Sequence, residues 1–282
     1  HPSRGSKPIP NCGRGGRGER RDADREKGCY PCTKGPLRLD EPMAGMVQAR
    51  SLAPARALKD TGPFLDRLDL PEDDARRLME LGEDAVTSRR RPVTVMFTDI
   101  VEFTPQAEDL PEQDTAELLN HHFALLGACI EREHGMIDKY IGDAVMAVWG
   151  GLQRQDDHAD AAIRTALAIA KAVHEDNEQR KLNGRLPIRM RIGLHSGPVV
   201  VGNIGAPGRV NFTVVGDAVN VAQRFEQLGK EFMKPEDEVV VLTSAQTIAA
   251  VKNRASLGIE LPRPEMRMIK GHEHPVEVYR LI

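Results

Sequence analysis

The sequence lacks long hydrophobic runs, a strong charge of either sign and a rich supply of cysteine. No apolar stretch approaches the roughly 20 residues that a membrane-spanning helix needs. The start shows no basic segment followed by an apolar one, so we expect no secretory signal and a cytoplasmic location. The formal net charge is −3, and this near-neutral balance predicts no nucleic-acid partner.

The four cysteines give little support for a metal or redox centre. Cys29 and Cys32 form a C-x-x-C pair, but a structural zinc site needs a second pair, and only Cys12 lies nearby. We therefore interpret the pair as part of an exposed tail. Cys129 lies in an amphipathic run and is expected to be a small buried hydrophobe.

Composition divides the chain into three parts. Residues 1–42 are rich in glycine, arginine, proline, lysine and serine, and they are predicted to be a disordered or non-native tail. Residues 43–91 carry short helical patterns and are predicted to be a helical linker, suited to couple an upstream regulatory region or to dimerise. Residues 92–282 are predicted to form the globular domain.

Within residues 92–282, strand and helix patterns alternate. Apolar periodicity predicts helices over 114–133, 157–181 and 217–228 and from 243 onward. Strands are predicted in the run that starts at 93, in a hairpin over 137–149, and at 188–194, 209–215, 239–242 and 276–281. Asp217 is expected to cap its helix, and Gly229 to end it. This order predicts helices packed on a largely antiparallel sheet.

Two aspartates stand at the ends of predicted strands. Asp99 follows the apolar run that begins at Val93, and Asp143 lies in a Gly142-Asp143 dipeptide typical of tight hairpin turns. Two strands can therefore deliver one carboxylate each to the same place. Two carboxylates, with the other ligands left to water and phosphate, are a usual way for proteins to hold magnesium at a nucleotide.

A third signal lies in the helix that follows the strand residues FTVVG. Asn220 and Arg224 are four residues apart, so both side chains project from one face of this helix. Such a pair is normally solvated surface. Here it emerges from the end of a strand, where ligands tend to bind.

Four segments, in this order, resemble the catalytic domain of class III nucleotidyl cyclases: FTDIVEFT, KYIGDAVMAVW, GLHSGPVVVGNIG and NFTVVGDAVNVAQRFE. The resemblance covers residues 92–282. It implies an α+β fold with a ferredoxin-like βαββαβ core and extra C-terminal elements. It also implies a head-to-tail homodimer whose active sites form between the two protomers.

The resemblance further implies a role for each matching residue. Asp99 and Asp143 match the residues that bind two metal ions, Mg²⁺ or Mn²⁺, and Ile100 matches the position whose backbone carbonyl meets a metal. Asn220 and Arg224 match the pair that orients the ribose and stabilises the transition state. The remaining residues expected to bind substrate are Lys139, Thr213, Phe103, Thr104 and Lys270.

Lys139 and Thr213 match the pair that reads the purine. A lysine donor and a hydroxyl acceptor suit N1 and N6 of adenine, whereas guanylyl members of the family typically carry Glu at the position of Lys139. ATP is therefore the predicted substrate, and 3′,5′-cyclic AMP and pyrophosphate are the predicted products. Many adenylyl cyclases have Asp at the position of Thr213; this chain resembles the subgroup with Thr, some of whose members respond to bicarbonate.

One segment departs from the family pattern. The family often has Lys-Gly-Lys or Lys-Gly-Arg near the C-terminus, where the second basic residue touches the terminal phosphates. Here the residues are Lys270-Gly271-His272. Either Lys270 substitutes for the missing base, or His272 makes a weaker, pH-dependent contact.

Several other functions remain open from the sequence. A guanylate cyclase and a catalytically weak cyclase-like regulatory module share the same motifs. A diguanylate cyclase or polymerase-palm enzyme shares the two-metal core, but it lacks the Asn-x-x-x-Arg helix. A dinucleotide-binding protein is disfavoured because Gly202, Gly205 and Gly208 do not have the G-x-G-x-x-G spacing.

Overall fold

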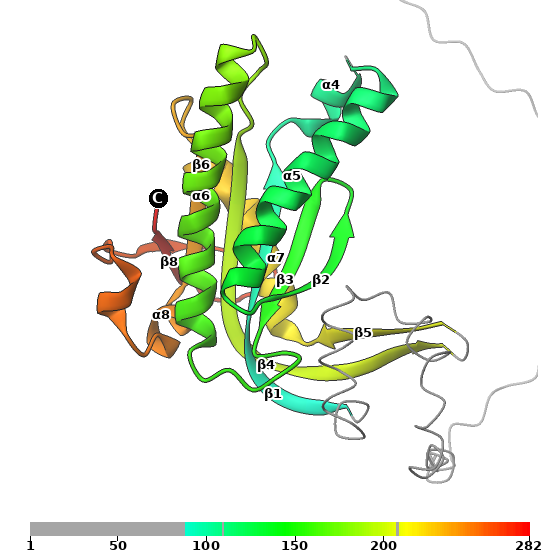
Figure 1. Ribbon diagram of the computed structural model, residues 1–282. Helices are drawn as coiled ribbons and strands as arrows, with labels where there is room; N and C mark the ends of the chain where they lie inside the picture. Colours follow the sequence, from blue (N-terminus) through cyan, green and yellow to red (C-terminus); the bar gives the residue numbers. More distant parts are fainter. Residues whose placement is uncertain (1–87, 109, 207–208) are drawn as a thin grey trace, which may run out of the picture. The chain divides into compact units, whose positions relative to one another are not determined.

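The computed structural model describes residues 88–108, 110–206 and 209–282 (Figure 1). The predicted tail, the linker up to residue 87 and the cysteines at 12, 29 and 32 lie outside the described residues. None of the helices in the described part is long and apolar enough to cross a membrane.

The described residues form an eight-stranded sheet with the order β2-β3-β1-β4-β6-β8-β7, and β5 pairs with β4 beside this path. The first four strands are β1 (Arg89–Ile100), β2 (Met136–Ile141), β3 (Ala144–Trp149) and β4 (Met190–Ala206). The others are β5 (Arg209–Val215), β6 (Val239–Ser244), β7 (Glu265–Arg267) and β8 (Val276–Arg280). Only the β4–β6 pair is parallel, so the largely antiparallel sheet is confirmed for this part of the chain.

The first half of the fold is the predicted ferredoxin-like core. Its chain order is β1, α5 (Glu112–Arg132), β2, β3, α6 (His158–Leu182) and β4, with β1 between β3 and β4 in the sheet. Helix α4 (Phe103–Glu108) is inserted between β1 and α5. The second half adds α7 (Asp217–Phe232), α8 (Ala245–Ala250) and the short helix η2 (Arg254–Leu257) with the remaining strands.

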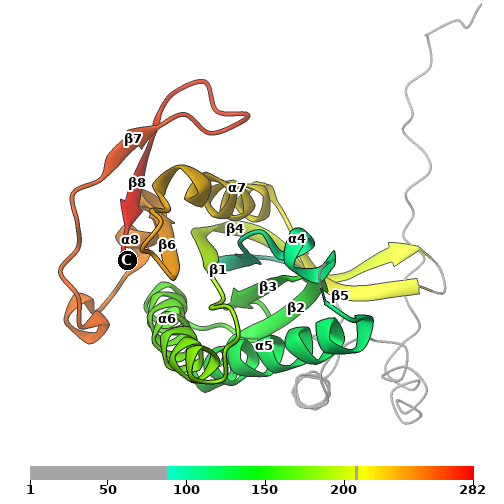
Figure 2. The same cartoon turned by 90° about the horizontal axis from the view of Figure 1, so that it is seen from above.

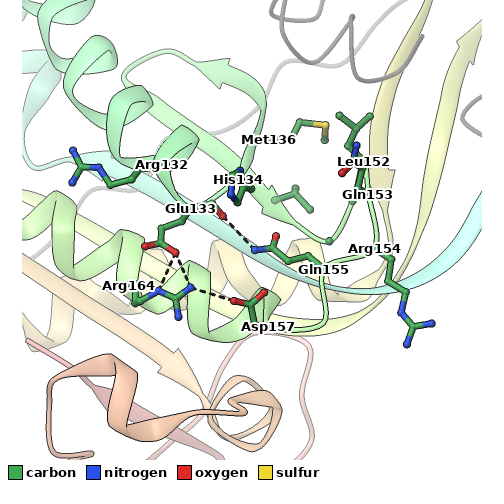
Figure 3. A pocket seen from close by; sticks show the side chains of 13 residues that line it. Arg132, Glu133, His134, Met136, Leu152, Gln153, Arg154, Gln155, Asp157 and Arg164 are labelled. Carbon is green, nitrogen blue, oxygen red and sulfur yellow. Dashed lines mark hydrogen bonds and ion pairs between the residues drawn. The ribbon is translucent and has the colours of Figure 1, made fainter. Parts of the chain in front are cut away.

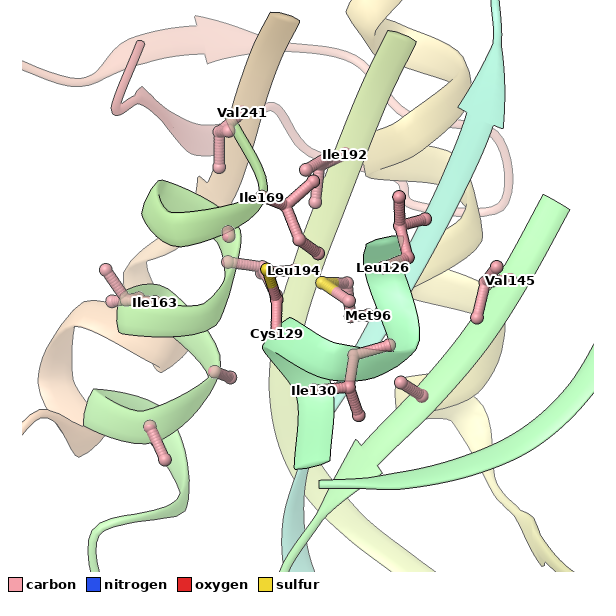
Figure 4. Packing of buried hydrophobic residues seen from close by; sticks show 14 of the residues in the cluster. Met96, Leu126, Cys129, Ile130, Val145, Ile163, Ile169, Ile192, Leu194 and Val241 are labelled. Atoms are coloured by element: carbon pink, nitrogen blue, oxygen red, sulfur yellow. The ribbon is translucent and has the colours of Figure 1, made fainter. Parts of the chain in front are cut away.

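Helices cover both faces of the sheet, as Figure 2 shows, with α5 and α6 on one side and α7 on the other. Alternate residues of β1 explain this arrangement, because successive side chains of a strand point to opposite faces. Met96 packs with Leu126 of α5 and Ile169 of α6 in the first core cluster (Figure 4). Phe97, the next residue, packs with Ala222 of α7 in the second cluster.

Cys129 lies in the cluster between α5 and α6 as a free thiol with 5% of its surface exposed. The expectation of a small buried hydrophobe is therefore confirmed. Burial raises the pKa of this thiol.

The structure corrects several predicted boundaries. Strand β1 begins at Arg89, inside the segment that composition assigned to the linker. The helix expected from Thr243 is present as α8 but begins at Ala245, because Thr243 belongs to β6 and the Ser244 hydroxyl caps α8 by accepting from the Thr247 N–H at 3.3 Å. Asp217 is the first residue of α7, not its cap, which is Gly216.

Gly229 does not end α7, because the helix continues to Phe232. The absence of a side chain at Gly229 has a packing reason instead. A Cβ there would lie 3.0 Å from the Cδ of Arg191 on β4. Sequence periodicity shows where a helix is amphipathic, but it does not distinguish a glycine that ends a helix from one that admits a neighbour.

Gly193 of β4 allows α7 to cross the sheet at very short range. A Cβ at Gly193 would lie 2.5 Å from the carbonyl oxygen of Ala222 and would also collide with the backbone of Glu226. Neither obstacle is a flexible side-chain end, so α7 would have to move. Because α7 carries Asn220 and Arg224, this close approach positions two of the predicted site residues.

We predict that Gly193→Ala destabilises the domain by about 1–3 kcal/mol, the typical cost of overpacking. Gly127→Ala is the matched control, since a Cβ there meets only the Ile137 side chain at 3.7 Å. Alanine also favours the helix at position 127, so this control should be neutral or stabilising. Urea unfolding of both variants measures the difference. Equal stabilities would contradict the close packing of α7 on β4.

Candidate active site

The hairpin between β2 and β3 brings Asp143 to the end of β1. Gly142 has a φ of 65°, which glycine adopts without steric cost, so the chain reverses in the two residues Gly142-Asp143. The Asp143 Oδ2 then accepts a hydrogen bond from the Ile100 N–H at 2.9 Å. Asp99 is the neighbour of Ile100 in β1, so the two predicted metal-binding carboxylates meet as expected.

The environment of Asp99 raises the pKa of its carboxyl. Burial is the main cause, and the negative charge of Asp143 adds to it, while Arg191 and Lys230 act in the opposite direction. A cation between the two carboxylates would relieve this repulsion. Two carboxylates and the nearby backbone of Ile100 offer the hard oxygen ligands that Mg²⁺ or Mn²⁺ prefers, so these residues fit the predicted metal ions.

Arg191 is a site residue that the sequence did not reveal. It stands opposite Asp99 in the antiparallel register of β1 and β4, and its Nη2 forms an ion pair with the Asp99 Oδ2. Its Nε donates to the Glu226 Oε1 of α7 at 2.9 Å. The guanidinium is therefore held between two carboxylates. The alternation of apolar residues with arginine in IRMRIGL was the only available signal for it.

A cavity of about 490 Å³ opens beside these residues. Half of the predicted site residues line it, namely Asp99, Ile100, Phe103, Thr104 and Asp143. Three basic side chains that were not predicted share the wall: Arg189, Arg191 and Lys230. Glu102, at the turn from β1 into α4, has a left-handed φ of 57°. The cavity thus joins a pair of carboxylates to a basic wall.

The predicted purine-reading pair also comes together, across two strands that are not neighbours in the sheet. The Lys139 Nζ of β2 donates to the Thr213 Oγ1 of β5 at 3.2 Å. Asp138, which was not predicted, touches both, because its Oδ2 accepts from Thr213 at 3.0 Å and pairs with Lys139 at 2.8 Å. Thr213 is 8% exposed.

The C-terminal Lys270-Gly271-His272 turn lies beside the predicted transition-state residue. Gly271 has a φ of 83°, and a Cβ there would be 3.1 Å from the Arg224 Nη1. Arg224 is half-buried, and Asn220 is exposed one turn earlier on α7. The structure therefore places the Arg224 guanidinium against Gly271, the residue that follows Lys270, whose role the sequence left open.

The described part of the chain does not unite all the predicted residues in one cavity. The cavity that contains Asp99 and Asp143 is lined by none of Lys139, Thr213, Asn220, Arg224 and Lys270. Within one chain, the predicted metal-binding residues Asp99 and Asp143 thus line a cavity that the residues expected to bind the base and the ribose do not share.

A second cavity, of about 610 Å³, is lined by none of the predicted residues (Figure 3). Both of its carboxylates are paired with one arginine. The Arg164 Nη2 lies 2.7 Å from Glu133 and 3.2 Å from Asp157, and the Gln155 side chain donates to the Glu133 carbonyl at 3.3 Å. Both carboxylates here pair with Arg164, whereas at the other cavity only Asp99 pairs with an arginine among the described residues, so this cavity is a weaker candidate for metal chemistry.

Comparisons with known proteins agree on the kind of domain. Residues 86–281 match the family model described as the adenylate and guanylate cyclase catalytic domain. Adenylate cyclase 1 of Rhizobium meliloti (strain 1021) is 30% identical over 221 residues, which cover 78% of this chain and 32% of that protein. The chain thus spans about a third of the length of this curated relative.

Two solved structures are similar to this chain. The adenylyl cyclase CyaB from P. aeruginosa has a TM-score of 0.62 and 29% identity, over 70% of this chain and 96% of that one. The guanylyl cyclase Cya2 has a TM-score of 0.61 and 29% identity, over 69% of this chain and 93% of that one. An adenylyl cyclase and a guanylyl cyclase are thus similar to this chain to the same degree.

We predict that Asp143→Asn weakens Mn²⁺ binding at least tenfold without lowering stability. The amide keeps an oxygen that can accept from the Ile100 N–H, while the repulsion with Asp99 disappears. Electron paramagnetic resonance titration measures free Mn²⁺, and thermal unfolding measures stability. Asp114→Asn, an exposed position in the first turn of α5, is the control and should bind Mn²⁺ as the original protein does. Unchanged affinity in Asp143→Asn would contradict the metal assignment.

Proposed function

The chain belongs to the adenylate and guanylate cyclase catalytic domain family, and we propose that it is an adenylate cyclase, converting ATP to 3′,5′-cyclic AMP and pyrophosphate in cyclic-nucleotide signalling. The observation that carries this proposal is the contact of Lys139 with Thr213 at 3.2 Å. An ammonium donor beside a hydroxyl oxygen complements adenine, which has an acceptor at N1 and a donor at N6.

The proposed metal ligands are the carboxylates of Asp99 and Asp143 and the backbone carbonyl of Ile100. Members of this family generally use divalent metal ions. When bound, two Mg²⁺ or Mn²⁺ ions would help to deprotonate the attacking ribose 3′-oxygen and would neutralise the leaving pyrophosphate. Asp99 and Asp143 would hold these cations in the cavity that is also lined by the basic side chains of Arg189, Arg191 and Lys230.

The basic wall suits a polyphosphate. Arg191 is fixed by Glu226 on one side and Asp99 on the other, and Arg189 donates to the backbone carbonyls of Lys234 and Asp237. A guanidinium held in this way can bind phosphate oxygens with little further loss of freedom. We propose that this wall binds the phosphates of ATP, with Phe103 and Thr104 beside them.

Arg224 is the proposed transition-state residue. Negative charge builds on the α-phosphoryl oxygens during cyclisation, and a positioned guanidinium stabilises it. Removing a contact of this kind typically raises the barrier by about 3–4 kcal/mol. Asn220, one turn earlier on α7, would orient the ribose, and Lys270, next in sequence to the Gly271 that lies against Arg224, would contact phosphate.

We propose that a head-to-tail homodimer completes the site. The supporting observation is that the cavity of Asp99 and Asp143 is not lined by Lys139, Thr213 or Arg224 in one chain. If the carboxylates of one protomer face the base- and ribose-binding residues of its partner, each dimer has two complete sites.

The alternative function is that of a guanylate cyclase, and the similarity to Cya2 favours it as much as the similarity to CyaB favours the adenylate cyclase. A catalytically weak regulatory module is a less economical alternative, because Asp99, Asp143 and Arg224 are all present. Cyclic nucleotides formed from ATP and from GTP, each with Mg²⁺ and with Mn²⁺, distinguish the three. Faster turnover of GTP would overturn the proposal, and no product with either nucleotide would favour the regulatory module.

Mixing two inactive variants tests the shared site. After subunit exchange, equal amounts of Asp99→Ala and Arg224→Ala should recover about a quarter of the original activity, because half of the dimers are mixed and each has one intact site. Asp99→Ala mixed with Asp143→Ala is the control and should stay inactive, since both changes damage the same half of the site. Exchange is verified with differently tagged chains. No recovery after verified exchange would count against a site shared in this way.

We predict that Lys139→Glu loses most activity with ATP and gains measurable activity with GTP. A carboxylate can accept from the guanine N1–H, whereas the Lys139 N–H directed to the base would face this donor without an acceptor, which is costly in an enclosed site. Discrimination by hydrogen bonding can be large when mismatched groups are buried. The measurement is kcat/KM for both nucleotides in both proteins. An unchanged ratio would mean that Lys139 does not read the base.

A further inference from the structure

Strand β2 contains an irregularity at Asp138, next to the proposed base-reading lysine. Its pairing with β3 shifts register between Ile137 and Lys139, so Asp138 has no partner residue in the ladder. A bulge of this kind breaks the strict alternation of side chains and can re-aim one of them. Here the two consecutive residues Asp138 and Lys139 both reach Thr213 on β5.

The Asp138 carboxylate is fully enclosed, yet only one of its oxygens is satisfied. Its side chain is 0% exposed, compared with 41% for that of Lys139. The Oδ2 accepts from Thr213 at 3.0 Å and pairs with Lys139 at 2.8 Å, whereas the Oδ1 has no hydrogen-bond partner among the described residues. A buried acceptor without a donor destabilises the fold, so a carboxylate at this position calls for an explanation other than stability.

Counting protons shows what this carboxylate does to Thr213. A hydroxyl has one proton and two lone pairs. The Thr213 proton is directed to Asp138, and one lone pair accepts from the Lys139 Nζ at 3.2 Å. Only a lone pair remains for a ligand. Lys139 has three N–H groups, of which two are directed to Asp138 and Thr213, so it has one donor left.

We propose that Asp138 is a specificity-determining positioning residue, which holds the Thr213 hydroxyl in its acceptor orientation and thereby selects adenine over guanine. This inference rests on the proposed function. The acceptor on Thr213 matches the exocyclic amino group of adenine, and the free N–H of Lys139 matches its N1. Because the carboxylate is enclosed, Asp138 acts on the base through the Thr213 hydroxyl and not by direct contact.

Guanine is mismatched with such a site at two of its hydrogen-bonding positions. Its O6 would face the lone pair of Thr213, and its N1–H would face the ammonium of Lys139. A free threonine could turn its proton toward O6, but Asp138 already holds that proton. A neutral amide at position 138 could instead donate to Thr213 and release the hydroxyl proton for guanine. The unsatisfied Oδ1 is therefore the cost of keeping an obligatory acceptor at this place.

The test is Asp138→Asn, which is nearly the same size as the original residue. We expect the ratio of kcat/KM for ATP to that for GTP to fall at least about tenfold, since hydrogen-bond selection in an enclosed site supports ratios well above this. Asp156→Asn is the matched control, because Asp156 also pairs with a basic neighbour, Arg154 at 2.9 Å, but is exposed. Its ratio should equal that of the original protein. An unchanged ratio in both Asp138→Asn and Asp138→Ala, which removes the acceptor altogether, would overturn the proposal.

A double-mutant cycle separates positioning from a general structural effect. Thr213→Val removes the hydroxyl, so adding Asp138→Asn to Thr213→Val should leave the ATP:GTP ratio unchanged. If Asp138→Asn lowers the ratio equally with and without the hydroxyl, Asp138 does not act through Thr213 and the proposal is wrong. Asp138→Ala is measured beside Asp138→Asn, because an amide oxygen can still accept from Thr213 whereas alanine cannot; thermal unfolding checks that both variants fold. In Asp138→Ala the Thr213 hydroxyl proton is free to turn toward O6 of guanine, so the same fall in ratio is expected.

Measurements on the original protein distinguish a failure of the proposed adenylate cyclase function from a failure of the role proposed for Asp138. If it cyclises neither nucleotide, or prefers GTP, the proposed adenylate cyclase fails and this inference falls with it. If it prefers ATP and both Asp138→Asn and Asp138→Ala keep that preference, only the role of Asp138 is wrong.

Discussion

The antiparallel pairing of β1 with β3 on one side and β4 on the other is the constraint on which the candidate site depends. Pairing with β3 places the Gly142-Asp143 turn beside the end of β1, and pairing with β4 places Arg191 opposite Asp99. A shift of one residue in either register would turn these side chains to the other face of the sheet. The apolar residues of β1, buried on both faces, hold both registers.

The end of the sheet at Asp99 holds several charged side chains close together, an arrangement that lowers the stability of the fold. Asp99 and Asp143 repel each other, which together with burial raises the pKa of Asp99. Arg191 is buried between Asp99 and Glu226, and burial raises the pKa of Glu226. Such arrangements cost stability and are typical of sites that bind charged ligands. The hydrophobic clusters on the two faces of the sheet offset that cost.

Much of the fold could be predicted because its signals are local. The helix over 112–132 and the hairpin around Gly142 follow from apolar periodicity and from a two-residue turn that needs a positive φ. The predicted ends of helices and strands were wrong where tertiary packing outweighs local propensity. Thr243 pairs with β8 and stays in a strand, and Gly229 packs against Arg191 inside a helix. The short helix α4 has no buried residue, so it left no periodic signal.

The sequence by itself determined which residues stand at strand ends and turns, and hence the paired carboxylates Asp99 and Asp143. Only the tertiary structure decided which distant side chains join them. Arg191 meets Asp99 across 92 positions of sequence, and Thr213 meets Asp138 across 75. Contacts of this kind arise from strand register and from a bulge in β2, which depend on the pairing of whole strands. A local pattern specifies the conformation of its own segment, but the partner of a buried charge is chosen when the sheet assembles.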